Sequence, residues 1–187
     1  MKGRMLHDKN SNTHLQLYGQ NKDEVIYSVS RSFLNISLLD HVERQKDIQL
    51  SFNHELTDAD FENKKINFGD KAISFNRIIG SDGFTSQLRN LMLKKEDLKF
   101  RKKPLGHGYK ELTIPPSLNG KYKMDPNALH IWPRGNFMLI ALPNMDKSFT
   151  CTLFAPMKGV GSFEKIKSSD DILFFFETEF PDTIQLI

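Results

Sequence analysis

Asp82 and Gly83 stand where this sequence could bind a phosphate. They end the segment RIIGSDG, residues 77–83, which predicts a buried strand leading into a tight turn, and a helix is predicted over residues 84–93. A helix N-terminus offers free backbone N–H groups and the positive end of its dipole to an anion. Gly83 permits close approach, and Asp82 could accept a hydrogen bond from a ribose hydroxyl. An ordinary helix N-cap is the alternative interpretation of Asp82, and the residues alone favour it.

Other signatures of catalysis are missing from the sequence. There is no GxSxG motif, and Gly106-His107-Gly108 begins like GxGxxG but has no third glycine and no helix after it. Cys151 falls inside a predicted strand, which favours an inert buried thiol. No paired zinc spacing occurs among the six histidines, so no metal site is predicted; they are His7, His14, His41, His54, His107 and His130.

Composition narrows the class of protein. The 187 residues suffice for one ordinary domain with a core, and 26 basic against 23 acidic residues give a net charge of only +3, too weak to argue for nucleic acid. A single cysteine excludes an internal disulfide and fits a reducing compartment, by default the cytoplasm. No apolar run of membrane-spanning length and no signal peptide occurs, so we expect a chain without a membrane segment.

The first half of the chain alternates short strands with helices. A helix is predicted from a cap at Ser30 to about residue 45, with Phe33, Leu34, Leu38, Leu39 and Val42 on a buried face. The segment KKEDLKFRKKP, residues 94–104, is interpreted as a solvated surface rather than a basic binding patch. A turn is expected at 58–60, and strands are expected at 3–7, 14–18, 25–29, 48–52, 65–68 and 71–75.

The second half predicts an antiparallel meander followed by helices. A turn is predicted at 133–136, and the last helix should be capped by Ser169 or Asp170 and followed by Pro181. The strands are expected at 109–114, 121–124, 128–132, 137–142 and 148–154, and the helices at 163–167 and 170–180. The fold class expected from both halves is α+β or α/β.

The central hairpin, LHIWPRGNFMLIALPN, has one face that is either a core or the wall of a pocket. Because side chains alternate along a strand, Leu129 and Ile131 share one face, and Met138, Ile140 and Leu142 share a face of the next strand. Phe154 joins them from the strand after, whereas His130 and Trp132 point the other way and are interpreted as structural.

Three stretches carry a resemblance to a known family: YKELTIPP at 109–116, LHIWPRGNFMLIALPN at 129–144 and SFTCTLF at 148–154. They resemble the kynurenine 3-monooxygenases, which are flavin-dependent aromatic hydroxylases. The likeness extends from MKGRM at the start, through SVSR and GSDG, to the last residues. Family members also carry an initial GxGxxG and a later Gly-Asp-Ala-Ala-His stretch, neither of which occurs here, so an internal fragment truncated at both ends is expected.

The resemblance implies different roles for the two parts of the chain. Residues 1–105 would be part of an FAD-binding domain with substrate-contacting strands, and 106–187 a mostly antiparallel substrate-side sheet with helices. The implied reaction uses FAD, NADPH and O2 to hydroxylate L-kynurenine to 3-hydroxykynurenine in tryptophan degradation and NAD biosynthesis. The cofactor does the hard chemistry, so no side chain of this chain is assigned as catalytic, and the chain alone is expected to be inactive.

Site residues are carried over from the family position by position. Arg4 and Tyr18 match a carboxylate-binding pair, in which a guanidinium and a phenol donate to the substrate. Arg31 and Leu56 match FAD contacts, and the motif DGxxSxxR is implicated in FAD and NADPH contacts; here it comprises Asp82, Gly83, Ser86 and Arg89. The aromatic pocket is implied to be lined by Leu129, Ile131, Met138, Ile140, Leu142 and Phe154.

Two other functions remain open at this stage. A non-catalytic remnant, or a small-ligand-binding module, could keep the kynurenine pocket without oxidising anything, and the missing FAD loop favours it for this polypeptide. A related flavin hydroxylase acting on another aromatic acid would keep Asp82-Gly83 but should change Arg4, Tyr18 and LHIWPR. These residues are intact, so that alternative ranks last.

Overall fold

A computed structural model describes residues 1–21 and 23–186 and divides the chain into two compact units. The large unit comprises Met1–Leu34 together with the chain from Pro104 onward, and the small unit comprises Asn35–Lys103. The expected division at residue 105 lies beside the second boundary, but the first 34 residues fold with the C-terminal sheet. The assignment of residues 1–105 to an FAD-binding domain stays a prediction.

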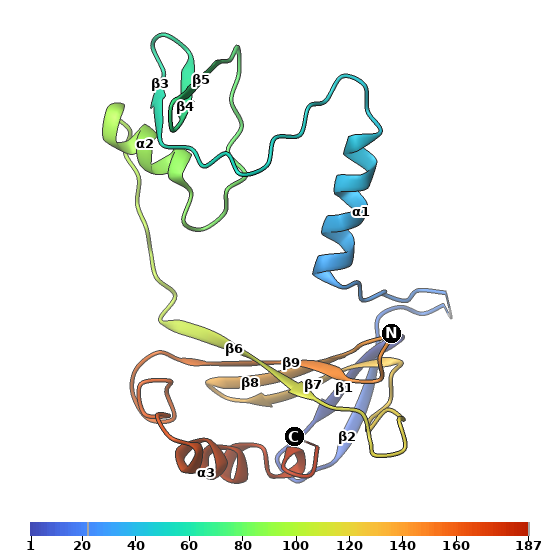
Figure 1. Cartoon of the computed structure of the whole chain (residues 1–187). Coiled ribbons are helices and arrows are strands. Elements are labelled where there is room, and N and C mark those ends of the chain that lie inside the picture. The colour runs from blue at the N-terminus through green and yellow to red at the C-terminus, as the bar shows by residue number, and fades with distance from the viewer. Residues whose placement is uncertain (22, 187) are drawn as a thin grey trace. The chain divides into compact units, whose positions relative to one another are not determined.

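The large unit is built on a mixed six-stranded sheet in the order β2-β1-β7-β8-β9-β6 (Figure 1). Only the β1–β7 pair is parallel, and the other four pairs are antiparallel. The strands are β1 (Gly3–His7), β2 (Thr13–Leu17), β6 (His107–Ile114), β7 (Ala128–Arg134), β8 (Phe137–Pro143) and β9 (Phe149–Pro156). The expected α+β class with a mostly antiparallel sheet is confirmed.

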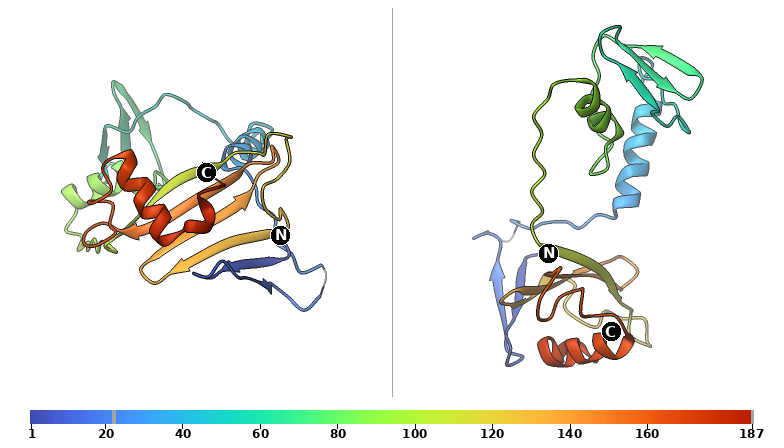
Figure 2. Two further views of the ribbon diagram at one scale, coloured as in Figure 1. Left: turned by 90° about the horizontal axis from the view of Figure 1, so that it is seen from below. Right: turned by 90° about the vertical axis from the view of Figure 1, so that its left-hand side faces the viewer.

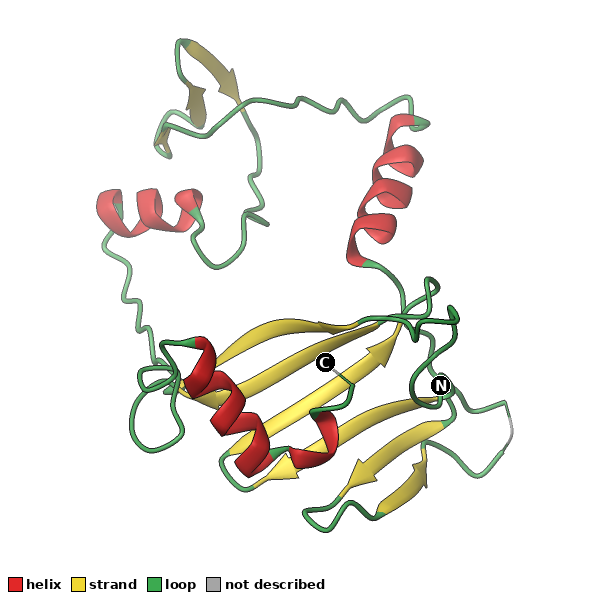
Figure 3. Ribbon diagram, turned by 60° about the horizontal axis from the view of Figure 1, so that its bottom comes forward, coloured by secondary structure: helices red, strands yellow, loops and turns green. Residues whose placement is uncertain are grey.

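One face of this sheet is covered by the C-terminal helices α3 (Ser169–Glu179) and η1 (Pro181–Thr183), as Figure 3 shows. Trp132 and Phe149 are fully buried there against Phe175, Phe176 and Phe180. Burial of each such side chain contributes roughly 2 to 3 kcal/mol to folding. This aromatic layer is the core of the large unit.

Helix α3 begins with a capping box. The Ser168 hydroxyl accepts the Asp171 N–H, and the Asp171 carboxylate accepts the Ser168 N–H. The predicted cap at Ser169 or Asp170 is therefore one or two residues late, because the box needs a serine three residues before its acid.

The β7–β8 turn is shorter than predicted. Pro133 and Arg134 belong to β7, so Gly135 and Asn136 alone connect the strands. Gly135 has a φ of +63°, which a two-residue hairpin requires and glycine adopts without strain. This keeps Arg134 in the strand, and its side chain is buried.

Several predicted elements are wrong. Residues 25–29, 48–52, 77–83 and 121–124 are not strands, and 163–167 forms turns rather than a helix. Alternation of side chains marks a segment that could be a strand, but a strand also needs a neighbour to pair its backbone groups. The turn expected at 58–60 is a short strand, because it pairs with residues 65–67.

The small unit contains an antiparallel sheet of β3 (Asp58–Asp60), β4 (Lys65–Phe68) and β5 (Lys71–Ser74), with helix α2 (Gln87–Lys95) (Figure 2). The Lys95 ammonium donates to the Ala59 carbonyl oxygen at 2.7 Å and lies 2.6 Å from the Asp58 carboxylate, which ties α2 to β3. The small unit has few buried apolar side chains: Ala59, Leu88 and Leu91.

Helix α1 (Arg31–Glu43) runs across the division between the units. The helix itself was predicted, but its predicted buried face is wrong: no residue of α1 is buried, and Phe33 is 65% exposed. Helical spacing is a local property, whereas burial needs a partner surface. Among the described residues no helix is both long and apolar enough to span a bilayer.

Candidate functional site

The sheet face opposite α3 collects the side chains predicted to line the pocket. The register places Leu129 beside Arg4, Ile131 beside Ile140 and Met138 beside Phe154. Leu142 lies two residues beyond Ile140 and so shares its face. These strands thus present a largely apolar surface, with Thr150 and Thr152 of β9 beside it and a cation at its margin.

This apolar surface is not the core of the large unit. Its members are half-buried or, like Met138 at 37%, just exposed, whereas Trp132 and Leu139 on the other face are fully buried. The hairpin therefore serves two layers at once: one face packs against α3, and the other is open to a ligand or to another layer.

Arg4 and Tyr18 lie together at the margin of this surface. The Tyr18 N–H donates to the Lys2 carbonyl oxygen at 3.1 Å, which continues the β1–β2 pairing, in which Gln16 lies opposite Arg4. The Arg4 guanidinium carbon is 5.4 Å from the centre of the Tyr18 ring. Both side chains thus occupy the face that carries Leu129.

The Tyr18 hydroxyl is buried and has no hydrogen-bond partner. Leaving a buried polar group unpaired costs about 1 to 3 kcal/mol. An incoming carboxylate could accept from this phenol and from the neighbouring guanidinium together. The geometry therefore suits an anion at the edge of the apolar surface.

His130 lies on the α3 side of the sheet, as the alternation of β7 predicts. Its Nε2 donates to the Asp125 carbonyl oxygen at 2.9 Å, so in the neutral ring its Nδ1 accepts from His7 Nε2, also at 2.9 Å. Burial lowers the pKa of both histidines, that of His7 to about 4, with the nearby His130 ring as the second cause. Sequence reasoning missed that His7 belongs to this buried polar cluster.

Cys151 is buried in β9 within the core. Burial raises the pKa of its thiol to about 12, so the reactive thiolate is scarce near neutrality. The expected burial of this thiol is confirmed. Among the described residues no three metal-ligating side chains come together.

The Asp82–Gly83 turn in the small unit holds the start of α2, but the cap is Ser86 rather than Asp82. The Ser86 hydroxyl accepts the Arg89 N–H at 3.1 Å and donates to the Asp82 carboxylate, which also accepts the Leu88 N–H at 3.1 Å. These bonds, the one from Ser86 first, lower the pKa of Asp82. The helix end thus already holds an anion of its own, and the phosphate site proposed from the residues alone is disfavoured there.

The other members of the motif support the same turn. Gly83 has a φ of +73°. The Arg89 guanidinium donates to the carbonyl oxygens of Gly83 and Phe84. Arg31 lies in the other unit, exposed, as the first residue of α1.

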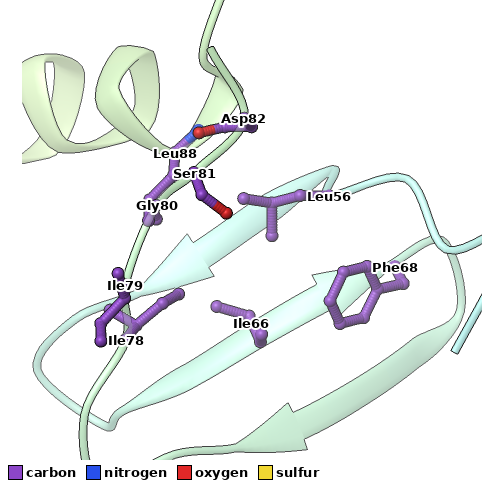
Figure 4. A pocket seen from close by; sticks show the side chains of 9 residues that line it. All are labelled: Leu56, Ile66, Phe68, Ile78, Ile79, Gly80, Ser81, Asp82 and Leu88. Carbon is purple, nitrogen blue, oxygen red and sulfur yellow. The ribbon is translucent and has the colours of Figure 1, made fainter. Parts of the chain in front are cut away.

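An apolar cavity of about 320 Å³ opens beside this turn (Figure 4). Leu56 and the β4 residues Ile66 and Phe68 form one side, and the segment from Ile78 to Asp82 forms the other, with Leu88 next to it. Leu56 and Asp82, carried over separately from the family, are thus brought to one cavity. Its walls suit a planar apolar ring, and no cation lines it.

Comparisons of the sequence point to one kind of protein. Kynurenine 3-monooxygenases from Dictyostelium discoideum, Myxococcus xanthus and Anopheles gambiae are 41%, 40% and 41% identical to this chain, and each alignment covers all of it. By sequence, the chain is a homologue of part of the kynurenine 3-monooxygenases. It spans 41%, 42% and 39% of the length of these relatives. No protein-family model matches the chain.

The fold has a counterpart among solved structures. The tetracycline destructase Tet(51) matches with a TM-score of 0.50 over 95% of this chain and 43% of that protein, at 15% identity. At this identity the match speaks for the fold alone.

Proposed function

We propose that this chain forms the substrate-side wall of a flavin-dependent monooxygenase that hydroxylates L-kynurenine to 3-hydroxykynurenine with O2 and NADPH. The observation that carries the proposal is the shared sheet face, on which Arg4 and an unpaired Tyr18 hydroxyl adjoin an open apolar surface. The homology to kynurenine 3-monooxygenases supports the choice of substrate.

Arg4 and Tyr18 would hold the amino-acid end of kynurenine. The guanidinium supplies two parallel N–H donors to the carboxylate, and the phenol supplies a third. Pairing would also relieve the cost of the buried, unbonded Tyr18 hydroxyl. The carboxylate is thus fixed at the margin of the sheet, and the aromatic ring extends over its apolar face.

The aromatic ring of kynurenine would lie against the apolar surface. Six apolar side chains from three strands make up most of this surface, beside the hydroxyl-bearing Thr150 and Thr152 of β9: Leu129, Ile131, Met138, Ile140, Leu142 and Phe154. Such a wall orients the ring and keeps water from the reacting atoms. These residues bind the aromatic ring and exclude water, and they move no proton.

FAD fits only in part among the described residues. The cavity beside Leu56 suits an aromatic ring, and the Asp82 carboxylate has lone pairs left for a hydroxyl of the cofactor. The FAD diphosphate does not fit there, because the helix end already holds Asp82 and no cation lines the cavity. Arg31 is the cation that the family resemblance assigns to FAD. When bound, the flavin would supply the activation of oxygen.

Replacement of Arg4 tests the proposal. Arg4→Ala removes charge-assisted bonds worth about 1.5 to 3 kcal/mol, so L-kynurenine should bind roughly 10- to 100-fold more weakly, as measured by calorimetry. Lys110→Ala, an exposed cation on the edge strand β6, is the control and should not change affinity. Equal affinities of Arg4→Ala and the unmodified chain would contradict the proposed role.

Absorption spectra separate the enzyme from the binding-module alternative when they are recorded, after incubation with FAD, on a polypeptide extended at both ends to the length of the relatives, because the chain alone is expected to be inactive. Retained flavin, together with NADPH consumption that depends on kynurenine, supports the monooxygenase. Kynurenine binding without any flavin binding supports a module that keeps only the pocket.

A further inference from the structure

The guanidinium of Arg134 is buried where β1, β7 and the end of α3 meet, and the side chain has no exposed area. Its Nη1 donates to the His7 carbonyl oxygen at 2.8 Å, and its Nη2 donates to that of Asp8 at 3.1 Å. Its Nε donates to the Glu179 carbonyl oxygen at 2.7 Å. One side chain thus binds the end of β1 and the end of α3 at the same time.

Asp182, in η1, provides the negative charge for this arrangement. Its Oδ1 lies 3.6 Å from Arg134 Nη2 and makes no other polar contact, and its Oδ2 accepts the indole N–H of Trp132 at 2.6 Å. The His7 ring stacks on Trp132 with 4.1 Å between ring centres, and its Nδ1 is 3.8 Å from the carboxylate. We call His7, Trp132, Arg134 and Asp182 the buried clamp.

The clamp binds the backbone of the first strand just beyond the last residues that pair with β7. The β1–β7 pairing ends at Leu6 and Ile131, and the next two carbonyl groups along the chain, those of His7 at the end of β1 and of Asp8 just after it, are the ones that Arg134 binds. A slip of one residue between β1 and β7 would turn Arg4 to the other face of the sheet. It would also move both carbonyl groups away from the guanidinium, so the clamp opposes the slip.

We propose that the buried clamp fixes the register of β1 and thereby positions Arg4, which makes Asp182 a positioning residue for substrate binding. The link to substrate rests on the proposed function; the link to β1 does not. Removing one partner of a buried ion pair leaves the other charge unpaired, which is strongly unfavourable. Loss of the Asp182 charge on one face of the sheet should therefore alter the position of Arg4 on the other face.

Asp182→Asn tests the clamp with little change of shape, because the amide oxygen can still accept the indole N–H. Amide hydrogen exchange in β1 should become at least about 10-fold faster, while β8 and β9 stay protected. Ser162→Ala is the matched control: Ser162 is fully buried in the same unit and donates to the Gly159 carbonyl oxygen, away from β1. Unchanged exchange in β1 would overturn the proposal.

A double-mutant cycle tests whether Asp182 acts through Arg4. Asp182→Asn should weaken L-kynurenine binding about 5- to 10-fold in the unmodified chain and leave it unchanged in the Arg4→Ala background. An equal loss in both backgrounds would show that Asp182 does not position Arg4 and would overturn that part of the proposal. If Arg4→Ala alone changes nothing, the carboxylate site of the proposed function fails, and the exchange experiment still decides whether the clamp holds β1.

Arg134→Lys provides a second, independent test of the clamp from the side of the guanidinium. It keeps the charge but loses the fork that binds the carbonyl groups of His7 and Asp8 at once. The same acceleration of exchange in β1 supports the clamp, and full protection of β1 contradicts it.

Discussion

The large and small units of this chain depend on burial to very different degrees. The six-stranded sheet has fully buried aromatic side chains such as Trp132 and Phe149 packed against α3, whereas the three-stranded sheet buries little more than Ala59 under α2. The large unit thus carries a core of its own. The small unit relies on caps, turns and the Lys95–Asp58 ion pair. The same kind of substitution should therefore lower the free energy of unfolding more in the large unit than in the small one.

The largest effect is expected from Phe149→Ala. Truncation of a fully buried phenylalanine costs about 3 to 5 kcal/mol, seen as a shift of the urea midpoint that the fluorescence of the single Trp132 reports. Phe68→Ala in β4 of the small unit, where the side chain is only half-buried, should change the free energy of unfolding from the same urea titration by no more than about 0.5 kcal/mol. Similar costs for both would break the comparison between the units.

Acid should weaken the large unit through His7. Its pKa is about 4 in the folded chain and 6.5 ordinarily, so as pH falls the unfolded chain takes up the proton first. The stabilisation is complete above pH 6.5 and is lost between pH 6.5 and about 4, roughly 3 kcal/mol in all. The groups that face His7 are His130 and Arg134 from β7 and Asp182 from η1.

Urea titrations over this pH range measure the effect. His7→Gln should flatten the dependence, whereas His14→Gln, on the exposed strand β2, should preserve it. A slope that survives His7→Gln unchanged would assign the acid sensitivity to other groups, of which His130 is the first to examine because burial lowers its pKa too.

The smallest effect is expected from removing one helix cap in each unit. Ser86→Ala and Ser168→Ala each remove a hydroxyl that accepts a backbone N–H, at a cost of about 1 kcal/mol. The Ser168 change should appear in the unfolding of the large unit, because α3 is part of its core. The Ser86 change should appear only as faster amide exchange in α2. Loss of global stability from Ser86→Ala would mean that the two units unfold together.

Local signals explain which elements could be predicted. Helical spacing found α1 and α3, and the run from 137 to 142 found β8, because side-chain periodicity and turn residues act over short distances. The strands expected at 25–29 and 48–52 failed because a strand needs a partner at long range. The segment 58–60, predicted as a turn, forms the strand β3 because residues 65–67 pair with it.

The alternation of side chains along β7, β8 and β9 follows from the order of residues alone, because a strand has a period of two wherever it pairs. It could therefore separate Leu129 and Ile131 from Trp132 before any fold was known. The fold of the whole unit is needed to show that β1 lies parallel beside β7, that Arg4 and Tyr18 adjoin this surface, and that Asp182 meets Arg134. Those contacts join residues more than 40 positions apart, and chain topology, not local pattern, brings them together.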